Sequence, residues 1–238
     1  MTVLTISRLY GSEGDEIADH VCRTLGYRHF SKQHIAHAAV EAGLSEQEIA
    51  SYSNFSDVNY KYKRFLDRLI QRALPPAKER HPKEDAVSVF RVEEKLFNEA
   101  SAVTLVQQAI KRAYDAGNIV IIGRGGQIIL KDSPGVVHIR IEAPLVVRVR
   151  RIEARLKAER GDYEPHSKIK HDAGVLIAER DAASADYVRL FYGIDWAAPS
   201  FYHAVLNTGK MSIHQTAQII VAMVQCLFPE AGDKPSAG

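Results

Sequence analysis

Two glycine-rich stretches of this 238-residue chain carry the residue types that bind phosphate. The first glycine turn, Gly11-Ser12-Glu13-Gly14, follows the β-branched run 2–6 and precedes apolar residues at helical spacing. The second glycine turn, Gly123-Arg124-Gly125-Gly126, directly follows the apolar run 119–122. A glycine turn between a strand and a helix exposes backbone N–H groups, and the helix dipole adds partial positive charge. Both turns therefore predict anion sites, although a purely structural turn would also explain the first.

Arg124 in the second glycine turn adds a side chain suited to the same chemistry. A guanidinium at the end of a buried strand can grip a phosphate through two parallel hydrogen bonds, which a lysine cannot do. The alternative is a structural pairing of Arg124 with a nearby carboxylate.

Alternating strands and helices must position these turns. This alternation predicts an α/β domain with a mostly parallel sheet and right-handed crossovers. Ligands of such sheets bind beyond the carboxyl ends of the strands, and both turns fall there because both follow strands. Residues 158–171 are polar and contain Gly161 and Pro165, so we expect a mobile segment there. The expected strands are 2–6, 27–30, 119–122, 136–141 and 202–206, and the later helices are expected to end at 117, 157, 191 and about 227.

Charge and cysteine content exclude several classes of function. The net charge is +2, from 31 basic and 29 acidic residues, so no basic field covers the whole surface for nucleic acid. Cys22 and Cys226 lie far apart with no Cys-x-x-Cys motif, which excludes a disulfide framework or a zinc knuckle. Reduced thiols and the lack of a signal peptide or membrane span predict a soluble cytoplasmic protein without a membrane partner.

The stretch 61–83 holds eight Lys or Arg residues and two acidic residues. We interpret it as a solvated helix face inside an inserted helical subdomain. The alternative is a contact with nucleic acid or a partner protein, whose binding would depend steeply on salt.

Three stretches together make the chain resemble the cytidylate kinase-like family of P-loop nucleoside monophosphate kinases. The first is Ile6-Ser7-Arg8-Leu9-Tyr10-Gly11-Ser12-Glu13-Gly14-Asp15-Glu16-Ile17, and the second is Val120-Ile121-Ile122-Gly123-Arg124-Gly125. The third is the late stretch 192–210, which matches through Tyr192-Gly193-Ile194-Asp195-Trp196, Pro199, Tyr202 and Leu206-Asn207-Thr208-Gly209-Lys210. The resemblance covers nearly the whole chain outside about 44–98. It implies one P-loop NTPase-type, three-layer αβα domain over 1–238 with a five-stranded parallel sheet. It also implies a helical nucleotide-monophosphate-binding insertion over about 44–98, a lid over about 155–178, and a flexible tail over 229–238.

The resemblance also implies a reaction: Mg²⁺-dependent phosphoryl transfer from ATP to a nucleoside monophosphate, with CMP or dCMP as the default acceptor. Alignment and neutralisation of spreading negative charge do most of the catalysis in such transfers. The implied ATP-binding residues are Gly11, Ser12, Glu13, Gly14 and Arg151, the implied acceptor-binding residues are Ser31, Gly123, Arg124 and Asp181, and the implied arginines around the transferring group are Arg148 and Arg180.

The first glycine turn departs from the family pattern. The family often places arginine in the slot of the P-loop lysine, but here Asp15 fills it and Glu16 replaces the hydroxyl residue that follows. Arg8 could supply the missing cation as a catalytic residue. Asp15 and Glu16 could instead ligate Mg²⁺, since hard carboxylate oxygens suit that ion, or backbone N–H groups could bind the phosphate alone.

Further departures affect the acceptor. Family members often carry an acid at the positions of Ser31 and Gly125 and another lid arginine near Ser184. Their loss leaves the acceptor base poorly specified. A second hypothesis is therefore a degenerate, non-catalytic nucleotide-binding sensor or scaffold with an altered P-loop.

Overall fold

The structure is a computed structural model that describes residues 1–30, 34, 103–161 and 165–229. The chain divides into two compact units, one of residues 1–31 with 110–238 and one of residues 32–109. The first unit carries both glycine turns. The predicted insertion 44–98, the basic stretch 61–83, Ser31 and all but the first residue of the predicted tail 229–238 lie outside the described residues, so those interpretations stay predictions.

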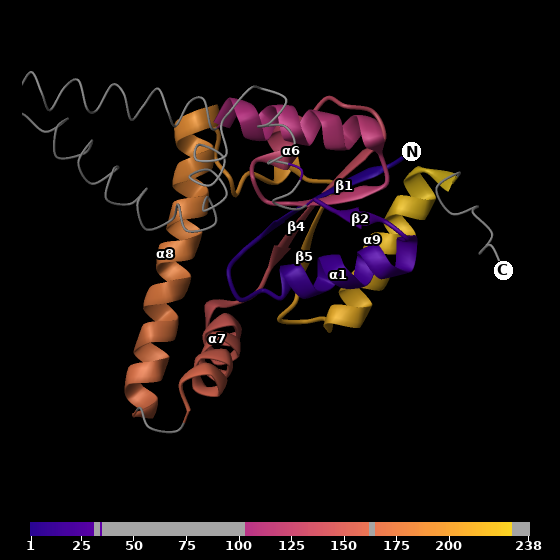
Figure 1. The fold of residues 1–238 in the computed structure, drawn as a ribbon. Helices are drawn as coiled ribbons and strands as arrows, with labels where there is room; N and C mark the ends of the chain where they lie inside the picture. The colour runs from indigo at the N-terminus through magenta and orange to yellow at the C-terminus, as the bar shows by residue number, and fades with distance from the viewer. Residues whose placement is uncertain (31–33, 35–102, 162–164, 230–238) are drawn as a thin grey trace, which may run out of the picture. The chain divides into compact units, whose positions relative to one another are not determined.

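Strands and helices alternate along the first unit as the sequence predicts (Figure 1). A helix over residues 103–116 ends at Gly117, whose φ of 63° is left-handed. The other elements, in chain order, are β1 (Val3–Arg8), α1 (Gly14–Leu25), β2 (Arg28–His29), β3 (Ile119–Ile122), α6 (Gly126–Ile129), β4 (Val136–Glu142), α7 (Leu145–Arg160), α8 (His166–Tyr192), the 3-10 helix η2 (Pro199–Phe201), β5 (Ala204–Asn207) and α9 (Ile213–Leu227).

The five strands form one sheet in the order β2-β3-β1-β4-β5, and every neighbouring pair is parallel. The runs that build β1, β3 and β4 are buried almost throughout, because parallel strands are covered by helices on both faces. The predicted α/β fold with a five-stranded parallel sheet is confirmed.

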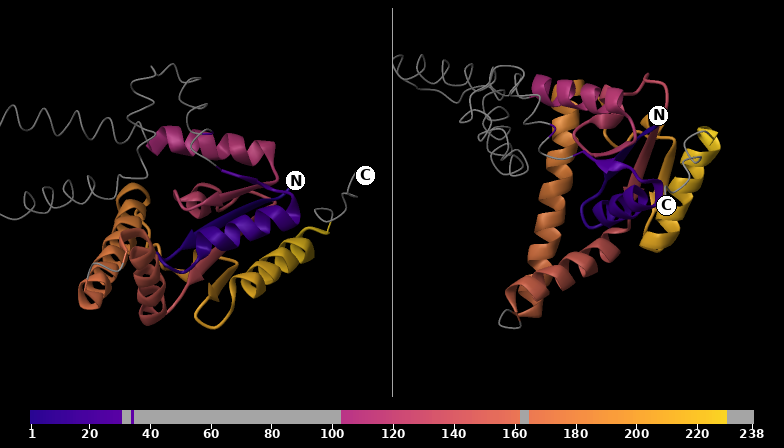
Figure 2. Two further views of the ribbon diagram at one scale, coloured as in Figure 1. Left: turned by 60° about the horizontal axis from the view of Figure 1, so that its bottom comes forward. Right: turned by 45° about the vertical axis from the view of Figure 1, so that its right-hand side comes forward.

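Helices α1 and α9 cover one face of the sheet together, and the three views agree on this (Figures 1 and 2). Their core includes Leu4 and Ile139 from the sheet, Ile17 from α1 and Ile220 from α9, all fully buried. A capping box begins α9, with Ser212 Oγ accepting a hydrogen bond from the Gln215 N–H. This packing fixes the amino end of α1, which continues the first glycine turn.

Helices α7 and α8 form an antiparallel hairpin (Figure 1). The prediction of a mobile segment over 158–171 is wrong for most of its length, because α7 continues to Arg160 and α8 begins at His166. Pro165 marks the start of a helix rather than a break, in line with its tolerance before the first turn. An ion pair of 2.7 Å between Arg160 and Asp172 and the buried Ile169 hold the two helices together.

None of the helices in the described ranges is long and apolar enough to cross a membrane.

Candidate functional site

The two glycine turns meet at one edge of the sheet. β1 and β3 are adjacent parallel strands with Ile6 aligned to Ile122, so their carboxyl ends lie side by side. The N–H of Gly123 donates to the carbonyl oxygen of Ile6 at 2.9 Å, which ties the second turn to the strand that leads into the first. The predicted juxtaposition of the turns is confirmed.

The first glycine turn is held by its own backbone and by Ser12. Gly11 has a φ of 81° and Glu13 a φ of 63°, both left-handed. Alternation of left-handed and ordinary residues is the arrangement in which successive N–H groups line an anion-binding concavity. Ser12 is fully buried, and its hydroxyl donates to the carbonyl oxygen of Leu9 at 2.7 Å. Its side chain therefore shapes the turn from beneath.

The side chain of Arg8 runs from the first turn toward the second. A Cβ built on Gly14 would lie 2.6 Å from the Cβ of Arg8, so only glycine lets this side chain pass. A Cβ built on Gly123 would lie 3.1 Å from Arg8 Nη1. The Nε of Arg8 is buried and has no hydrogen-bond partner in the described part of the chain. Arg8 therefore places positive charge between the two turns.

Asp15 is the ion-pair partner of Arg8. Arg8 Nη2 lies 3.1 Å from Asp15 Oδ1 and 3.4 Å from Oδ2. The side chains are 34% and 63% exposed, so water screens this pair strongly. Asp15, which the family resemblance predicts to fill the slot of the P-loop lysine, is thus paired with the cation that could replace that lysine.

Arg124 places a second guanidinium close to Arg8. It adopts a left-handed φ of 56°, and it is half-buried. Its pKa is lowered chiefly by burial, an effect that Tyr187 opposes and that the positive charge of Arg8 increases. Within the described ranges, no hydrogen bond or ion pair joins Arg124 to another residue, and its pairing with a carboxylate elsewhere stays an alternative. Two neighbouring guanidinia, of which only Arg8 is paired with a carboxylate among the described residues, suit an anion.

Arg148 and Asp181 grip the backbone of the first glycine turn at its entrance. Asp181 Oδ1 accepts the N–H of Tyr10 at 2.8 Å, and Arg148 Nη1 donates to the carbonyl oxygen of Tyr10 at 3.1 Å. The two side chains also pair with each other at 2.6 Å, with Arg148 buried. Arg148 Nε donates to the carbonyl oxygen of Ala143. Both residues thus brace the turn from α7 and α8.

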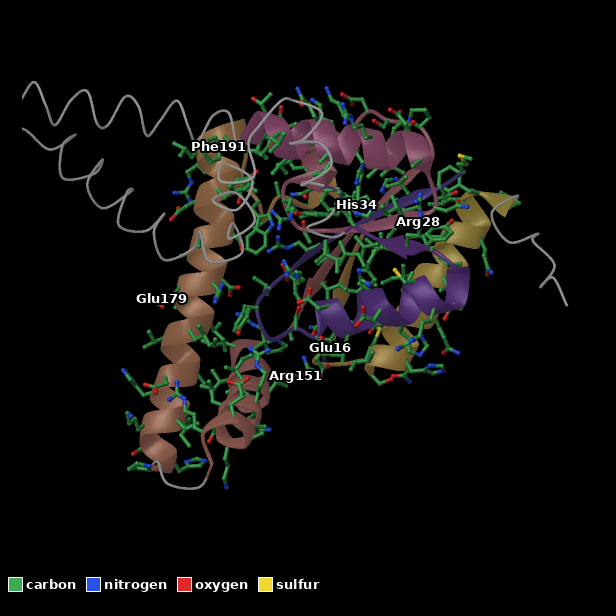
Figure 3. The ribbon with its side chains drawn as sticks, in the orientation of Figure 1. Glu16, Arg28, His34, Arg151, Glu179 and Phe191 are labelled. Carbon is green, nitrogen blue, oxygen red and sulfur yellow. The ribbon has the colours of Figure 1, made fainter. Side chains whose placement is uncertain are left out.

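Arg151 braces the turn from its other side. Its guanidinium donates to Thr208 Oγ1 at 3.0 Å and to the Thr208 carbonyl oxygen at 2.9 Å, and it pairs with Glu13 Oε2 at 2.7 Å. Thr208 Oγ1 donates in turn to the carbonyl oxygen of Ser12 at 2.9 Å. Figure 3 shows Arg151 on α7 near the amino end of α1, where Glu16 lies.

Tyr10 brings Arg180 into this region. The Arg180 guanidinium lies 5.9 Å from the centroid of the Tyr10 ring, within reach of a cation–π contact. The Arg155 guanidinium lies over the same ring at 5.1 Å and bonds the Tyr10 hydroxyl. Ser184, where the family often has arginine, donates to the carbonyl oxygen of Arg180. Both hairpin helices therefore contact the first turn through Tyr10.

Gly125 and Tyr192 shape the second turn. Gly125 has a left-handed φ of 72°, and a Cβ there would lie 2.9 Å from Tyr192 Cε2. The Tyr192 ring therefore occupies the space into which any larger residue at position 125 would project. The Tyr192 hydroxyl is buried without a hydrogen-bond partner among the described residues.

Three contributors to the site were not predicted from the sequence. All three stand only as members of the family motifs, Tyr10 beside the glycines of the first motif, and Tyr192 and Thr208 in the late motifs. Their roles depend on contacts between residues more than 60 positions apart, so the motifs mark them without showing what they touch.

A sequence model of the cytidylate kinase-like family matches residues 3–210. The chain belongs to the cytidylate kinase-like family. A cytidylate kinase of Thermococcus sibiricus is 25% identical over 235 residues, which cover 98% of this chain and 93% of that protein. A cytidylate kinase of Methanosarcina acetivorans is 30% identical over 110 residues, 46% of this chain, and the chain spans 56% of that relative's length.

The crystal structure of an uncharacterized protein from Eubacterium ventriosum has the same fold. It aligns with a TM-score of 0.58 and 15% identity over 94% of this chain and 99% of the other. Family and fold together make this chain a kinase-like α/β protein.

Proposed function

We propose that this cytidylate kinase-like protein transfers a phosphoryl group from ATP to a nucleoside monophosphate, with CMP or dCMP as the first acceptors to test. The observation that carries the proposal is the meeting of the two glycine turns with Arg8 and Arg124 between them. Backbone N–H groups of two adjacent turns, together with two neighbouring guanidinia, suit two phosphate groups brought end to end. Phosphoryl transfer needs little more from a protein than this alignment and neutralisation.

Each turn would hold one substrate. Gly11, Ser12, Glu13 and Gly14 with Arg151 would bind the ATP phosphates, while Gly123, Arg124 and Asp181 with Ser31 would hold the acceptor. Since both Asp181 oxygens already bond Tyr10 and Arg148, its contribution to the acceptor would come through the position of the turn.

Three arginines would neutralise the transferring group in this proposal. Arg8 already lies between the turns and would replace the missing lysine. Arg180 would approach from α8 above Tyr10. Arg148 would act chiefly by positioning, because its Nε and Nη1 bond backbone carbonyls.

Mg²⁺ fits the residues at the start of α1. Asp15 and Glu16 are successive carboxylates in its first turn, and both are exposed. The described residues contain no cluster of three His, Cys, Asp or Glu side chains that could hold a metal. Asp15 and Glu16 would therefore hold the ion jointly with phosphate oxygens and water, which is the usual environment of Mg²⁺. When bound, it would neutralise phosphate charge.

A non-catalytic nucleotide sensor is the second candidate. The Arg8–Asp15 pair favours it, because a carboxylate in the lysine slot weakens the attraction for ATP. In either role we expect nucleotides as partners and a cytoplasmic location.

ADP release coupled to CMP, dCMP, UMP or AMP tests the proposal. We expect turnover with at least one acceptor, and loss of most of it in Arg124→Gln. Arg23→Gln removes the same group from an exposed position at the far end of α1 and should leave the rate unchanged. Acceptor-independent ATP binding without turnover would identify the sensor instead. Folded protein that binds no nucleotide would contradict both candidates.

A further inference from the structure

Glu13 in the first glycine turn and Asp15 directly after it are each paired with an arginine that could meet a phosphate. Glu13 Oε2 lies 2.7 Å from Arg151 Nη2, and Asp15 Oδ1 lies 3.1 Å from Arg8 Nη2. The two carboxylates stand on either side of Gly14 in the sequence. Each therefore takes the place on its guanidinium that a phosphate oxygen would otherwise fill.

The ion pair of Glu13 with Arg151 is partly buried and held by neighbouring residues. The Glu13 side chain is 28% exposed and Arg151 is 23% exposed, so water screens this pair less than the Arg8–Asp15 pair. Thr208 fixes the Arg151 guanidinium through two further hydrogen bonds. Glu13 holds its position despite a left-handed φ of 63°, a conformation that glycine adopts more readily. Its side chain makes no cap bond to α1, which leaves Arg151 as its ion-pair partner.

The two arginines approach the turn from opposite sides of β1. Arg8 reaches toward Gly123, which follows β3, the neighbour of β1 on one side. Arg151 bonds Thr208, which follows β5, beyond β4 on the other side. A single phosphate that displaced one carboxylate would exchange one anion for another and leave the second pair intact.

We propose that Glu13 and Asp15 are internal counter-ions of Arg151 and Arg8, and that they make the site selective for ligands with several linked phosphoryl groups. A chain of phosphates can bond both arginines and the backbone N–H groups of the turn together, and so displaces both carboxylates. Orthophosphate can displace only one carboxylate, and replacing one anion on an arginine by another gives little net binding free energy. The inference rests on the proposed function, since it assigns the selectivity of the same phosphate site.

Calorimetric titration with orthophosphate, pyrophosphate and tripolyphosphate, without Mg²⁺ and at constant ionic strength, tests this selectivity. We expect the wild-type chain to bind tripolyphosphate and to show no measurable affinity for orthophosphate. Glu13→Gln and Asp15→Asn should each tighten pyrophosphate binding about five-fold, the effect of releasing one partly exposed ion pair. The double variant should multiply the two effects and bind orthophosphate measurably.

Asp132→Asn is the matched control, because it removes one negative charge from an exposed side chain that follows α6. If Asp132→Asn tightens pyrophosphate binding as much as the two turn variants do, net charge alone explains the effect and the inference is overturned. Weaker pyrophosphate binding in the turn variants would also overturn it. Glu13→Gly supplies a second test at that position with a residue that accepts the left-handed backbone. If neither wild type nor variants bind tripolyphosphate, the inference is wrong.

This readout separates the inference from the proposed function. Altered phosphate selectivity without turnover on any nucleoside monophosphate would support the counter-ions and contradict the kinase. Turnover on a nucleoside monophosphate, with phosphate selectivity unchanged in both turn variants, would support the kinase and contradict the counter-ions.

Discussion

The carboxylate of Asp181 in α8 accepts a hydrogen bond from the N–H of Tyr10 at the entrance to the first glycine turn, at 2.8 Å and across 171 residues of sequence. Its other oxygen pairs with the buried Arg148 at 2.6 Å. A single side chain of α8 therefore joins the phosphate site to both helices of the α7–α8 hairpin. The geometry of the turn depends on the hairpin as well as on the glycines.

Asp181→Asn should lower stability and weaken nucleotide binding together. The substitution leaves Arg148 buried beside a neutral amide, and losing one partner of a largely buried pair costs about 3 kcal/mol. Urea unfolding and titration with ATP measure the two effects. Asp172→Asn breaks the Arg160 pair on the same hairpin, where side chains are 30% and 38% exposed, and should cost under about 1 kcal/mol. Equal losses in the two variants would show that Asp181 has no special link to the turn.

Gly125→Ala should disturb the second glycine turn by two separate effects. The left-handed φ of 72° penalises any side chain, and the new Cβ would lie 2.9 Å from the Tyr192 ring. Gly193→Ala is the control for the first effect, because Gly193 has a φ of 65° and nothing within 4 Å of its Cβ position. We expect a loss of about 1 kcal/mol for Gly193→Ala and of about 2–3 kcal/mol for Gly125→Ala.

Combining Gly125→Ala with Tyr192→Leu tests the cause of the larger loss. If the ring causes it, the double variant should lose less than the sum of the single variants in urea unfolding. Additive losses would mean that the backbone alone accounts for the effect.

The strands and both glycine turns could be predicted because their signals are local. A buried parallel strand is a continuous apolar run, as in β3, and a glycine turn that follows it must lie at the carboxyl edge of the sheet. The start of α8 was missed for the opposite reason. Its polar first turn is held by a contact with α7, that of His166 with Glu153, and polar residues whose partner is distant in the sequence resemble a loop.

The candidate site could be predicted only as a set of residue types. The sequence marks Arg8, Arg148 and Arg151 as cations near phosphate, but it does not show that each is already bonded to an acid or a carbonyl oxygen. Arg148, for example, bonds the carbonyl oxygen of Ala143, 5 positions away in the sequence, and that of Tyr10, 138 positions away. Pairing over such separations is decided by how the helices pack, which local spacing does not encode.

The two cysteines should differ sharply in reactivity. Burial, with a smaller effect of Asp19, raises the pKa of the Cys22 thiol to about 12, whereas Cys226 is exposed. Since the thiolate is the reactive form, Cys22 is protected both by its pKa and by access. Iodoacetamide at pH 8 should label only Cys226 in native protein and both cysteines in urea, and Cys226→Ser should abolish native labelling. Native labelling of Cys22 at a comparable rate would contradict the packing of α1.

Acid should destabilise the chain through His138 in β4. His138 is 5% exposed, and its Nδ1 lies 2.7 Å from Thr5 Oγ1. Burial, followed by the neighbouring His203, lowers the pKa of His138 to about 4. The unfolded chain takes up this proton near pH 6.5, so the native state loses stability as the pH falls from 6.5 to about 4.

The expected size follows from the difference between the two pKa values. Between pH 7 and pH 4.5, His138 should lower the free energy of unfolding by about 2 kcal/mol. His138→Gln removes the titrating group, so urea unfolding of this variant should change with pH by that much less than wild type, whatever its stability at pH 7. His171→Gln, at an exposed position on α8, should keep the wild-type pH dependence. Parallel pH profiles for wild type and His138→Gln would mean that another group drives the acid transition.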